Sequence, residues 1–381
     1  MRFTAEHEDF RRSVRRLVET EISPHVDQWE RDGTFPAHSL FPRLASLGLL
    51  GLEYDPAYGG EGADHLFTLV ACEELGRIPA AGISMAIGVQ TNMATPSLHR
   101  YGSEELKQQY LVPAIAGRMV AAIAVTEPGT GSDVSGLRTR AVRDGDEWVI
   151  NGSKLYITNG TQADWLCVLA RTSGEGGHRG ISQIIMPTDV AGFGVSRKLN
   201  KLGNRSSDTA ELTFENVRVP ITNTIGVAGR GFQQQMEQFV IERIFASYGV
   251  VGQTSFALER TREYLHQRHI FGQSLASKQY VAFRMSELAA RLDLLRSHNL
   301  QCAEAVMAGE DITRMATVAK LTAGRLARDV ADMCMQFHGG IGYMEETWTA
   351  RFFRDMRLAS IGGGADEVML QVLSRLDGFP A

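Results

Sequence analysis

Cysteine, net charge and long apolar runs are all scarce in this sequence of 381 residues. Its four cysteines lie far apart and form no Cys-x-x-Cys pair, which is typical of reduced thiols in a cytoplasmic protein rather than of a disulfide framework. The net charge of −5 provides no electrostatic basis for binding nucleic acid. The longest apolar stretch, near Val120–Val125, is far shorter than the ~20 residues that a membrane-spanning helix needs.

The N-terminal residues lack the apolar segment of a signal peptide, and acidic residues appear early among them. We therefore expect no secretory or transit peptide and a cytoplasmic location. The composition, 44% hydrophobic and 22% charged, is typical of a soluble globular protein. A chain of this length exceeds one ordinary hydrophobic core, so two or three domains are expected.

The spacing of apolar residues divides the chain into three segments. In residues 1–118, Phe10, Val14 and Leu17 recur at helical intervals, and prolines separate several helices. In residues 229–381 longer helices are expected, with a stripe that steps by four and three residues and predicts the seam of a helical bundle. The stripe consists of Val281, Met285, Leu288, Leu292 and Leu295.

Residues 119–228 carry strand and turn signals instead. Asp144-Gly145 and Asn151-Gly152 are typical of hairpin turns and flank the short run Glu147–Ile150. Short strands with regular turns predict a small β-barrel or sandwich between the two helical segments, in a chain that is mainly α. Further strand-like runs are Ala163–Ala170, Gly180–Met186 and Glu211–Pro220.

Three polar, glycine-bearing stretches carry the functional signal. Val125–Gly136 (VTEPGTGSDVSG) opens the β segment, and its backbone N–H groups and hydroxyls suit an anion or a flat heteroaromatic ligand, although such a loop alone is also common on surfaces. It is followed by Asn151–Gly160 (NGSKLYITNG) and, much later, by Gln336–Asp355 (QFHGGIGYMEETWTARFFRD). With these stretches in this order, the chain resembles the acyl-CoA dehydrogenase family over its whole length.

The resemblance implies the acyl-CoA dehydrogenase fold: an N-terminal helical domain, a small β-barrel and a C-terminal four-helix bundle. It implies FAD, bound without a covalent link between the β domain and the bundle, with its adenosine part reaching a neighbouring subunit of a homotetramer. The implied reaction converts an acyl thioester into its 2,3-enoyl product. The implied partner is an electron-transfer flavoprotein or a similar electron acceptor.

The resemblance also assigns the flavin contacts. The loop from Ile123 to Ser132 is expected along the isoalloxazine and pyrophosphate, and the Thr158 hydroxyl near N5, the hydride acceptor. Tyr156 stands where tryptophan is commoner in the family, which leaves the local packing and access to the flavin face open. The full set is Ile123, Val125, Thr126, Ser132, Tyr156, Ile157, Thr158, Arg268, Phe271, Gln279, Gln336, Gly339, Gly340, Ala365 and Glu367. Of these, Arg268, Phe271 and Gln279 are expected to serve the FAD of a partner subunit, and Gln336 to Gly340 its adenosine end.

The reaction needs a base for the α-proton, and the position of that base is unusual here. Many family members carry a glutamate in the loop that aligns with Gly362–Ala365, where this chain has Gly363. In isovaleryl- and long-chain-type members the glutamate lies on the first helix of the C-terminal domain, and Glu242 falls at that position, directly before Arg243. Glu242 has apolar neighbours and no cation four residues away, which favours a desolvated base. The rival acid, Glu237, lies on a different face of the same helix.

The glycines of this loop are then expected to work through their backbone. The Gly363 N–H is expected to polarise the thioester carbonyl together with a flavin ribityl hydroxyl, while the missing side chains leave room for a branched or bulky acyl group, as in isovaleryl- or citronellyl-type relatives. Val240 replaces an acid that some relatives use toward CoA, so coenzyme A and acyl carrier protein both remain possible thiol carriers. The expected substrate contacts are Ser132, Arg243, Gly362, Gly363 and Gly364.

Two other functions stay open at this point. One is an oxygen-reactive flavoenzyme such as an acyl-CoA oxidase, which rapid reoxidation of the reduced flavin by air would reveal. The other is a catalytically silent flavoprotein, whose flavin no acyl thioester would reduce.

Overall fold

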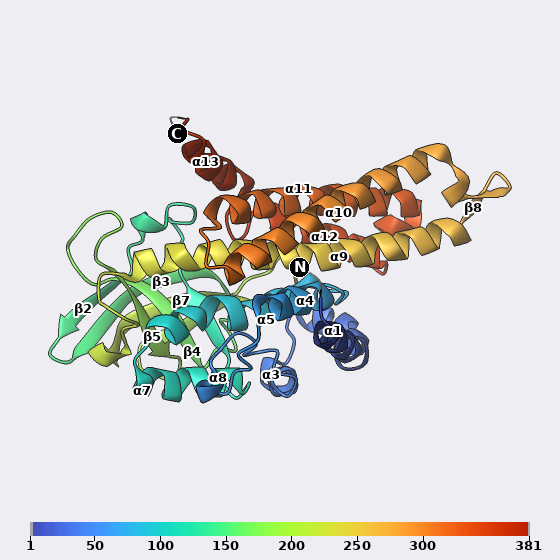
Figure 1. Ribbon diagram of the computed structural model, residues 1–381. Coiled ribbons are helices and arrows are strands. Elements are labelled where there is room, and N and C mark those ends of the chain that lie inside the picture. The colour runs from blue at the N-terminus through green and yellow to red at the C-terminus, as the bar shows by residue number, and fades with distance from the viewer. Residues whose placement is uncertain (1–2, 380–381) are drawn as a thin grey trace.

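The computed structural model describes residues 3–379, which form a helical N-terminal segment, a curled sheet and a long helical bundle (Figure 1). The predicted order of helices, strands and helices is therefore confirmed. Within the described residues, no helix has both the length and the apolar character needed to cross a membrane. All four cysteines are free and buried.

The N-terminal segment packs short helices around a core that includes Val14 and Leu17, as their helical spacing predicts. The first helix begins at a capping box, in which the Thr4 side chain accepts from the His7 backbone and the His7 side chain accepts from the Thr4 backbone. The helices are α1 (Ala5–Leu17), α2 (Val26–Asp32), α3 (Ala37–Ala45), α4 (His65–Leu75), α5 (Ala81–Gly88), α6 (Pro96–Tyr101), α7 (Glu104–Leu106) and α8 (Val112–Ile115), with a π-helical turn at Val89–Ala94 between α5 and α6.

The middle segment is a seven-stranded sheet with the order β1-β4-β2-β3-β7-β6, and β5 pairs with β4. Strands β1 and β4 are parallel, while the β2–β3, β3–β7, β4–β5 and β6–β7 pairs are antiparallel. The strands are β1 (Ala121–Ala124), β2 (Arg140–Asp144), β3 (Glu147–Thr158), β4 (Trp165–Arg171), β5 (Ile181–Pro187), β6 (Phe193–Lys198) and β7 (Thr209–Pro220).

One of the two predicted hairpin turns is wrong. Asp144-Gly145 does join β2 to β3, but Asn151-Gly152 lies inside β3, where the pairing with β7 shifts register. Gly152 has φ of +152°, and a Cβ there would lie 2.5 Å from the Thr139 Oγ1. The freedom of glycine is used for a bulge and a close approach here, and local sequence cannot distinguish this use from a turn.

The C-terminal segment is built on three long helices, α9 (Gly231–Gln267), α10 (Gln279–Met307) and α11 (Thr313–His338). The predicted stripe on α10 forms the seam: Val281, Leu288, Leu292 and Leu295 are buried, and Met285 packs against the same cluster. A small hairpin of β8 (His269–Ile270) and β9 (Gln273–Ser274) joins α9 to α10 at the end of the bundle far from the sheet (Figure 1). The chain ends with α12 (Trp348–Met356) and α13 (Asp366–Leu376).

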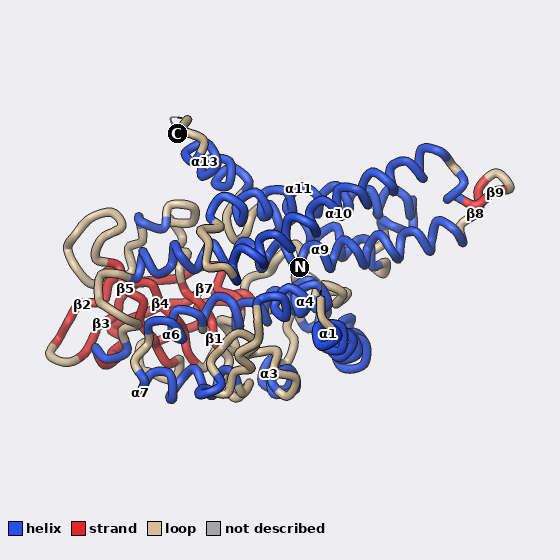
Figure 2. Tube along the Cα trace, viewed as in Figure 1, coloured by secondary structure: helices blue, strands red, loops and turns tan. Residues whose placement is uncertain are grey.

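The two halves of α9 have different surroundings, and this places the candidate site. Its first half runs beside the sheet and α6, and its second half continues between the N-terminal helices and the bundle (Figure 2). A buried carboxylate fixes the same junction from α12: Asp355 accepts hydrogen bonds from the backbone N–H groups of Ala81 (3.0 Å) and Asn204 (2.6 Å). One side chain thereby ties together all three segments of the chain.

Candidate active site

Glu242 lies in the first half of α9 and is only 7% exposed. It packs beside a cluster that contains the buried Ile244 and the partly buried Ile241 and Phe245. Burial raises the pKa of Glu242 to about 7, against the opposing effects of two glutamine hydrogen bonds and of the Arg243 charge. A carboxylate with a pKa near neutrality and little solvent around it is suited to take a proton from carbon.

Two buried glutamines contact this carboxylate, and neither is among the site residues predicted from the sequence. The Gln238 amide donates to Glu242 Oε1 at 2.8 Å, and the Gln235 amide donates to the same oxygen at 3.2 Å. They precede Glu242 by four and seven residues, so all three side chains lie on one face of the helix. This spacing was the available signal, because it is the same helical period that identifies apolar stripes.

The glycine loop follows a 3₁₀ turn, Arg357–Ser360, and precedes α13. Gly363 and Gly364 have φ of +64° and +98°, a region that favours glycine. A buried lysine on α11 holds the backbone of the loop: Lys320 Nζ donates to the carbonyls of Ala359 (2.7 Å) and Gly364 (3.0 Å). The expected break in the helix is therefore present, and its backbone is held by a specific side chain.

The same face of α11 also meets the residue that follows Glu242. Arg243 Nη1 donates to the Thr317 hydroxyl at 3.2 Å, and Thr317 precedes Lys320 by three residues on α11. Burial lowers the pKa of both Arg243 and Lys320, the latter to about 8. The structure thus brings the glycine loop and the Glu242–Arg243 pair to neighbouring positions across α9 and α11, although they are far apart in the sequence.

The two glycine-bearing stretches of the β segment are also joined. Lys154 is fully buried, and its Nζ donates to the Val125 carbonyl and to Glu127 Oε1, both at 2.9 Å. The Leu155 N–H donates to the Thr126 carbonyl at 2.8 Å. The loop that begins at Val125 is therefore held against the end of β3, where Tyr156 and Thr158 lie.

This region fits a large flat ligand. Tyr156 is 65% exposed and has φ of +64°, and no atom lies within 4 Å of a Cβ built at Gly129 or Gly131. An exposed aromatic side chain beside an open glycine backbone provides a stacking face and accessible N–H groups. Three further predicted residues lie in the same region: Ile123 and Ile157 on β1 and β3, and the exposed Ser132 in the loop.

A second group of predicted residues lies at the far end of the bundle. Phe271, at the tip of the β8–β9 hairpin, is 95% exposed, and Arg268 directly precedes that hairpin. Gln279 begins α10, and Gln336 lies in the last turn of α11. Gly339 and Gly340 follow in a 3₁₀ turn and have open space around them. Within one chain the structure does not bring this group to the loop of Val125–Gly136. Ala365 and Glu367 lie elsewhere again, at the start of α13, and Glu367 is exposed.

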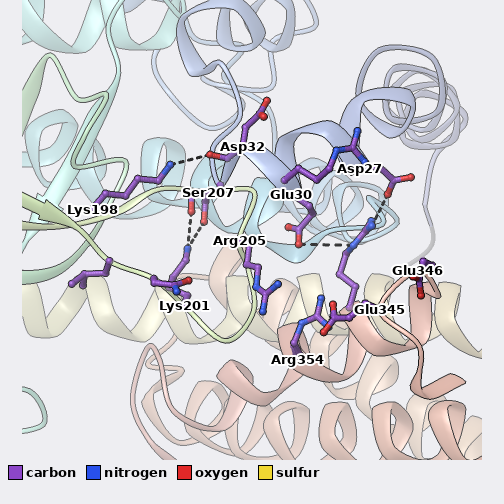
Figure 3. A pocket seen from close by; sticks show the side chains of 15 residues that line it. Asp27, Glu30, Asp32, Lys198, Lys201, Arg205, Ser207, Glu345, Glu346 and Arg354 are labelled. Atoms are coloured by element: carbon purple, nitrogen blue, oxygen red, sulfur yellow. Dashed lines mark hydrogen bonds and ion pairs between the residues drawn. The ribbon is translucent and has the colours of Figure 1, made fainter.

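A charged cleft of about 930 Å³ lies at another place and contains none of the predicted residues (Figure 3). Some of its charges are paired with one another: Arg351 contacts Asp27 at 2.5 Å, and Arg354 contacts Glu345 at 2.7 Å. Lys201 donates to the Ser207 carbonyl at 2.8 Å. The cleft is the junction of α2, the segment between β6 and β7, and the start of α12. Among the described residues, no three His, Cys, Asp or Glu side chains gather to hold a metal ion.

Comparison with known proteins gives consistent matches along the whole chain. Residues 4–118, 122–217 and 229–376 match the N-terminal, middle and C-terminal domains of acyl-CoA dehydrogenase. The mitochondrial long-chain specific acyl-CoA dehydrogenase of Sus scrofa is 36% identical over 375 residues, which cover 98% of this chain and 86% of that protein. The crystal structure of acyl-CoA dehydrogenase from Geobacillus kaustophilus shares 36% identity with a TM-score of 0.96 over 99% of both chains. A glutaryl-CoA dehydrogenase from Mycobacterium smegmatis in complex with FADH2 shares 29% identity with a TM-score of 0.93, over 100% of this chain and 96% of that one.

Proposed function

The chain belongs to the acyl-CoA dehydrogenase family, and on this premise we propose that it oxidises an acyl thioester to the 2,3-enoyl thioester with Glu242 as the base. The observation that carries the proposal is the buried carboxylate of Glu242, whose pKa is raised to about 7. At neutral pH a large fraction of this group is ionised and poorly solvated, the state that a base for a weak carbon acid requires.

The other residues of the site bind and orient the substrate. The Gly363 N–H is directed at the thioester carbonyl, where it stabilises the charge that develops as the α-proton leaves. Arg243 supports the thioester or carrier side, and Ser132, Gly362 and Gly364 complete the contacts. The buried surroundings of Glu242 exclude water from the proton that it holds.

FAD is the proposed cofactor, and it would supply the hydride acceptor for the β-carbon. The exposed Tyr156, the open glycines of the loop Val125–Gly136 and the Thr158 hydroxyl would hold its ring end. The separate group at the far end of the bundle suits the FAD of a partner subunit, because Phe271 is 95% exposed on a protruding hairpin and is available to a neighbouring chain. We therefore propose a homotetramer in the cytoplasm that passes electrons to an electron-transfer flavoprotein.

A branched or bulky acyl chain is the proposed substrate group. A Cβ at Gly363 would meet only the Lys320 Cε within 4 Å, at 3.6 Å, and a Cβ at Gly362 would meet Leu358 no closer than 3.4 Å. These are ordinary van der Waals distances, so a Cβ would fit at either position, and its absence leaves that volume to the acyl group. A panel of thioesters that varies chain and carrier tests this directly, and faster reduction by a short straight chain than by any branched one would contradict it.

Glu242→Gln tests the central assignment. We expect the variant to retain FAD but to lose substrate-dependent bleaching of the flavin under anaerobic conditions, because the amide cannot accept the α-proton. Glu237→Gln is the matched control, since this exposed acid on the same helix bonds Tyr101 and Gln233 instead. Normal bleaching in Glu242→Gln would show that the base is another group. Rapid reoxidation of the reduced wild-type flavin by air would instead identify an oxidase.

A further inference from the structure

The carboxylate of Glu242 is held by a buried network of neutral side chains. We propose that Gln235 and Gln238 are positioning residues for the base, which fix one carboxylate oxygen between two amide donors and leave the other oxygen for the substrate proton. The proposal rests on the role of Glu242 proposed above. It adds to the reaction two uncharged residues of this chain, which donate their hydrogen bonds to the base.

The contacts are close and almost fully removed from solvent. The amide nitrogens of Gln238 and Gln235 lie 2.8 Å and 3.2 Å from Glu242 Oε1. Gln238 and Glu242 are each 7% exposed, and Gln235 is completely buried. Both hydrogen bonds end on Oε1, so Oε2 is the oxygen left to accept the substrate proton.

The amide of Gln238 can adopt only one orientation. Its nitrogen also donates to the Met93 carbonyl, and its oxygen accepts from the Ser97 hydroxyl at 2.7 Å. A flipped amide would place its oxygen against the Met93 carbonyl and against Glu242, two groups that can only accept while the carboxylate is ionised. The π-helical turn and α6 therefore force the donor side of Gln238 toward the base.

Gln235 is anchored from the sheet. Its side-chain oxygen accepts from the Gln183 amide of β5 at 3.0 Å, which turns its own nitrogen toward Glu242. Gln183 is also completely buried, and its oxygen has no partner among the described residues. The two amides therefore approach Glu242 from supports in different parts of the fold, which keeps the carboxylate from rotating away.

These donors act on the charge of the base as well as on its position. A hydrogen bond donated to a carboxylate stabilises the ionised form, so both amides oppose the effect of burial. Two titratable groups face Glu242: Arg243 on α9, which also favours ionisation, and the Cys167 thiol on β4. Burial raises the pKa of Cys167 to about 12, so this thiol stays neutral. From the π-helical turn and α6 the network receives only the neutral Met93 carbonyl and Ser97 hydroxyl.

Gln238→Leu and Gln235→Leu test the proposal, with Gln234→Leu as a matched control. Gln234 is another buried glutamine of α9, but its amide donates to the Ile225 carbonyl instead of to Glu242. In anaerobic flavin reduction, we expect the acidic limb of the pH–rate profile to shift to higher pH by about one unit in each test variant. At pH values below the pKa of the base, this shift lowers the rate roughly 10-fold. The rate at high pH should stay within about 3-fold of wild type, because the base is then ionised again.

A second measurement reports on the carboxyl itself in the holoenzyme. The infrared carbonyl band that is present in the wild type and absent in Glu242→Gln belongs to protonated Glu242, and its titration midpoint should rise in Gln238→Leu and Gln235→Leu. Unchanged midpoints in both, or an equal rise in Gln234→Leu, would overturn the positioning role. Normal flavin reduction by Glu242→Gln would instead remove the base, so the two failures are distinguishable.

Discussion

Lys320→Met removes the side chain that holds the glycine loop. Lys320 is 2% exposed, and its ammonium group donates to the Ala359 carbonyl, in the 3₁₀ turn before the loop, and to the Gly364 carbonyl within the loop. Methionine has a similar length but donates no hydrogen bond. If Gly363 acts through its backbone N–H, freeing the loop should slow the reaction more than it destabilises the fold.

The effect on stability should be small because two terms oppose one another. Burial lowers the pKa of Lys320 from 10.5 to about 8, so keeping it protonated in the folded state at neutral pH costs roughly 3 kcal/mol. Methionine removes this cost but leaves two buried carbonyls without a donor, at about 1–3 kcal/mol each. The net change should be within about 3 kcal/mol. Because the folded pKa lies below the unfolded one, this group makes wild-type stability rise with pH from about 8 to 10.5, and the variant lacks that rise.

The effect on rate should be larger. Loss of one backbone donor to a developing oxyanion typically slows a reaction by about 100-fold or more. Anaerobic stopped-flow measurement of flavin reduction at saturating thioester gives this rate, and urea unfolding gives the stability. Lys201→Met is the matched control, since Lys201 also has a pKa of about 8 and bonds the Ser207 carbonyl, in the cleft of Figure 3. Wild-type reduction by a stable Lys320→Met protein would refute the role of the loop backbone.

Two further substitutions test the assembly and the junction of the three segments. Phe271→Asp places a charge on the exposed tip of the β8–β9 hairpin, which would disrupt the proposed contact with a partner subunit. Light scattering should then show a smaller particle, and the FAD content should fall. An unchanged mass and FAD content would contradict the proposed subunit contact. Asp355→Asn removes a carboxyl whose pKa is raised to about 6, chiefly by burial and then by Glu30. Between about pH 4 and pH 6 the carboxyl is ionised in the unfolded chain but still protonated in the folded one. As the pH rises through this range, the free energy of unfolding of the wild type, relative to that of Asp355→Asn, should therefore fall by up to about 3 kcal/mol. Urea unfolding measures this difference, and a difference that does not change with pH would disprove the assignment.

Much of the fold could be predicted from local spacing. The stripe from Val281 to Leu295 identified a bundle seam because a helix repeats its faces every 3.6 residues, whatever packs against them. The strand-like run Glu211–Pro220 corresponds to strand β7, and its apolar residues nearly alternate because successive side chains of a strand point to opposite faces. The prediction of a turn at Asn151-Gly152 was wrong because glycine is equally suited to a turn and to a β-bulge, and the local sequence does not distinguish the two.

The candidate site divides in the same way. The sequence by itself determined the family resemblance, the absence of a carboxylate at Gly363 and the choice of Glu242, since these depend on residue identity and order. Only the tertiary structure decided that Gln235 and Gln238 hold the carboxylate, that Lys320 closes the loop and that Lys154 joins the two glycine-bearing stretches. Hydrogen bonds depend on the distance and direction between groups that folding brings together. The identity of a polar residue therefore does not indicate which group will be its hydrogen-bond partner.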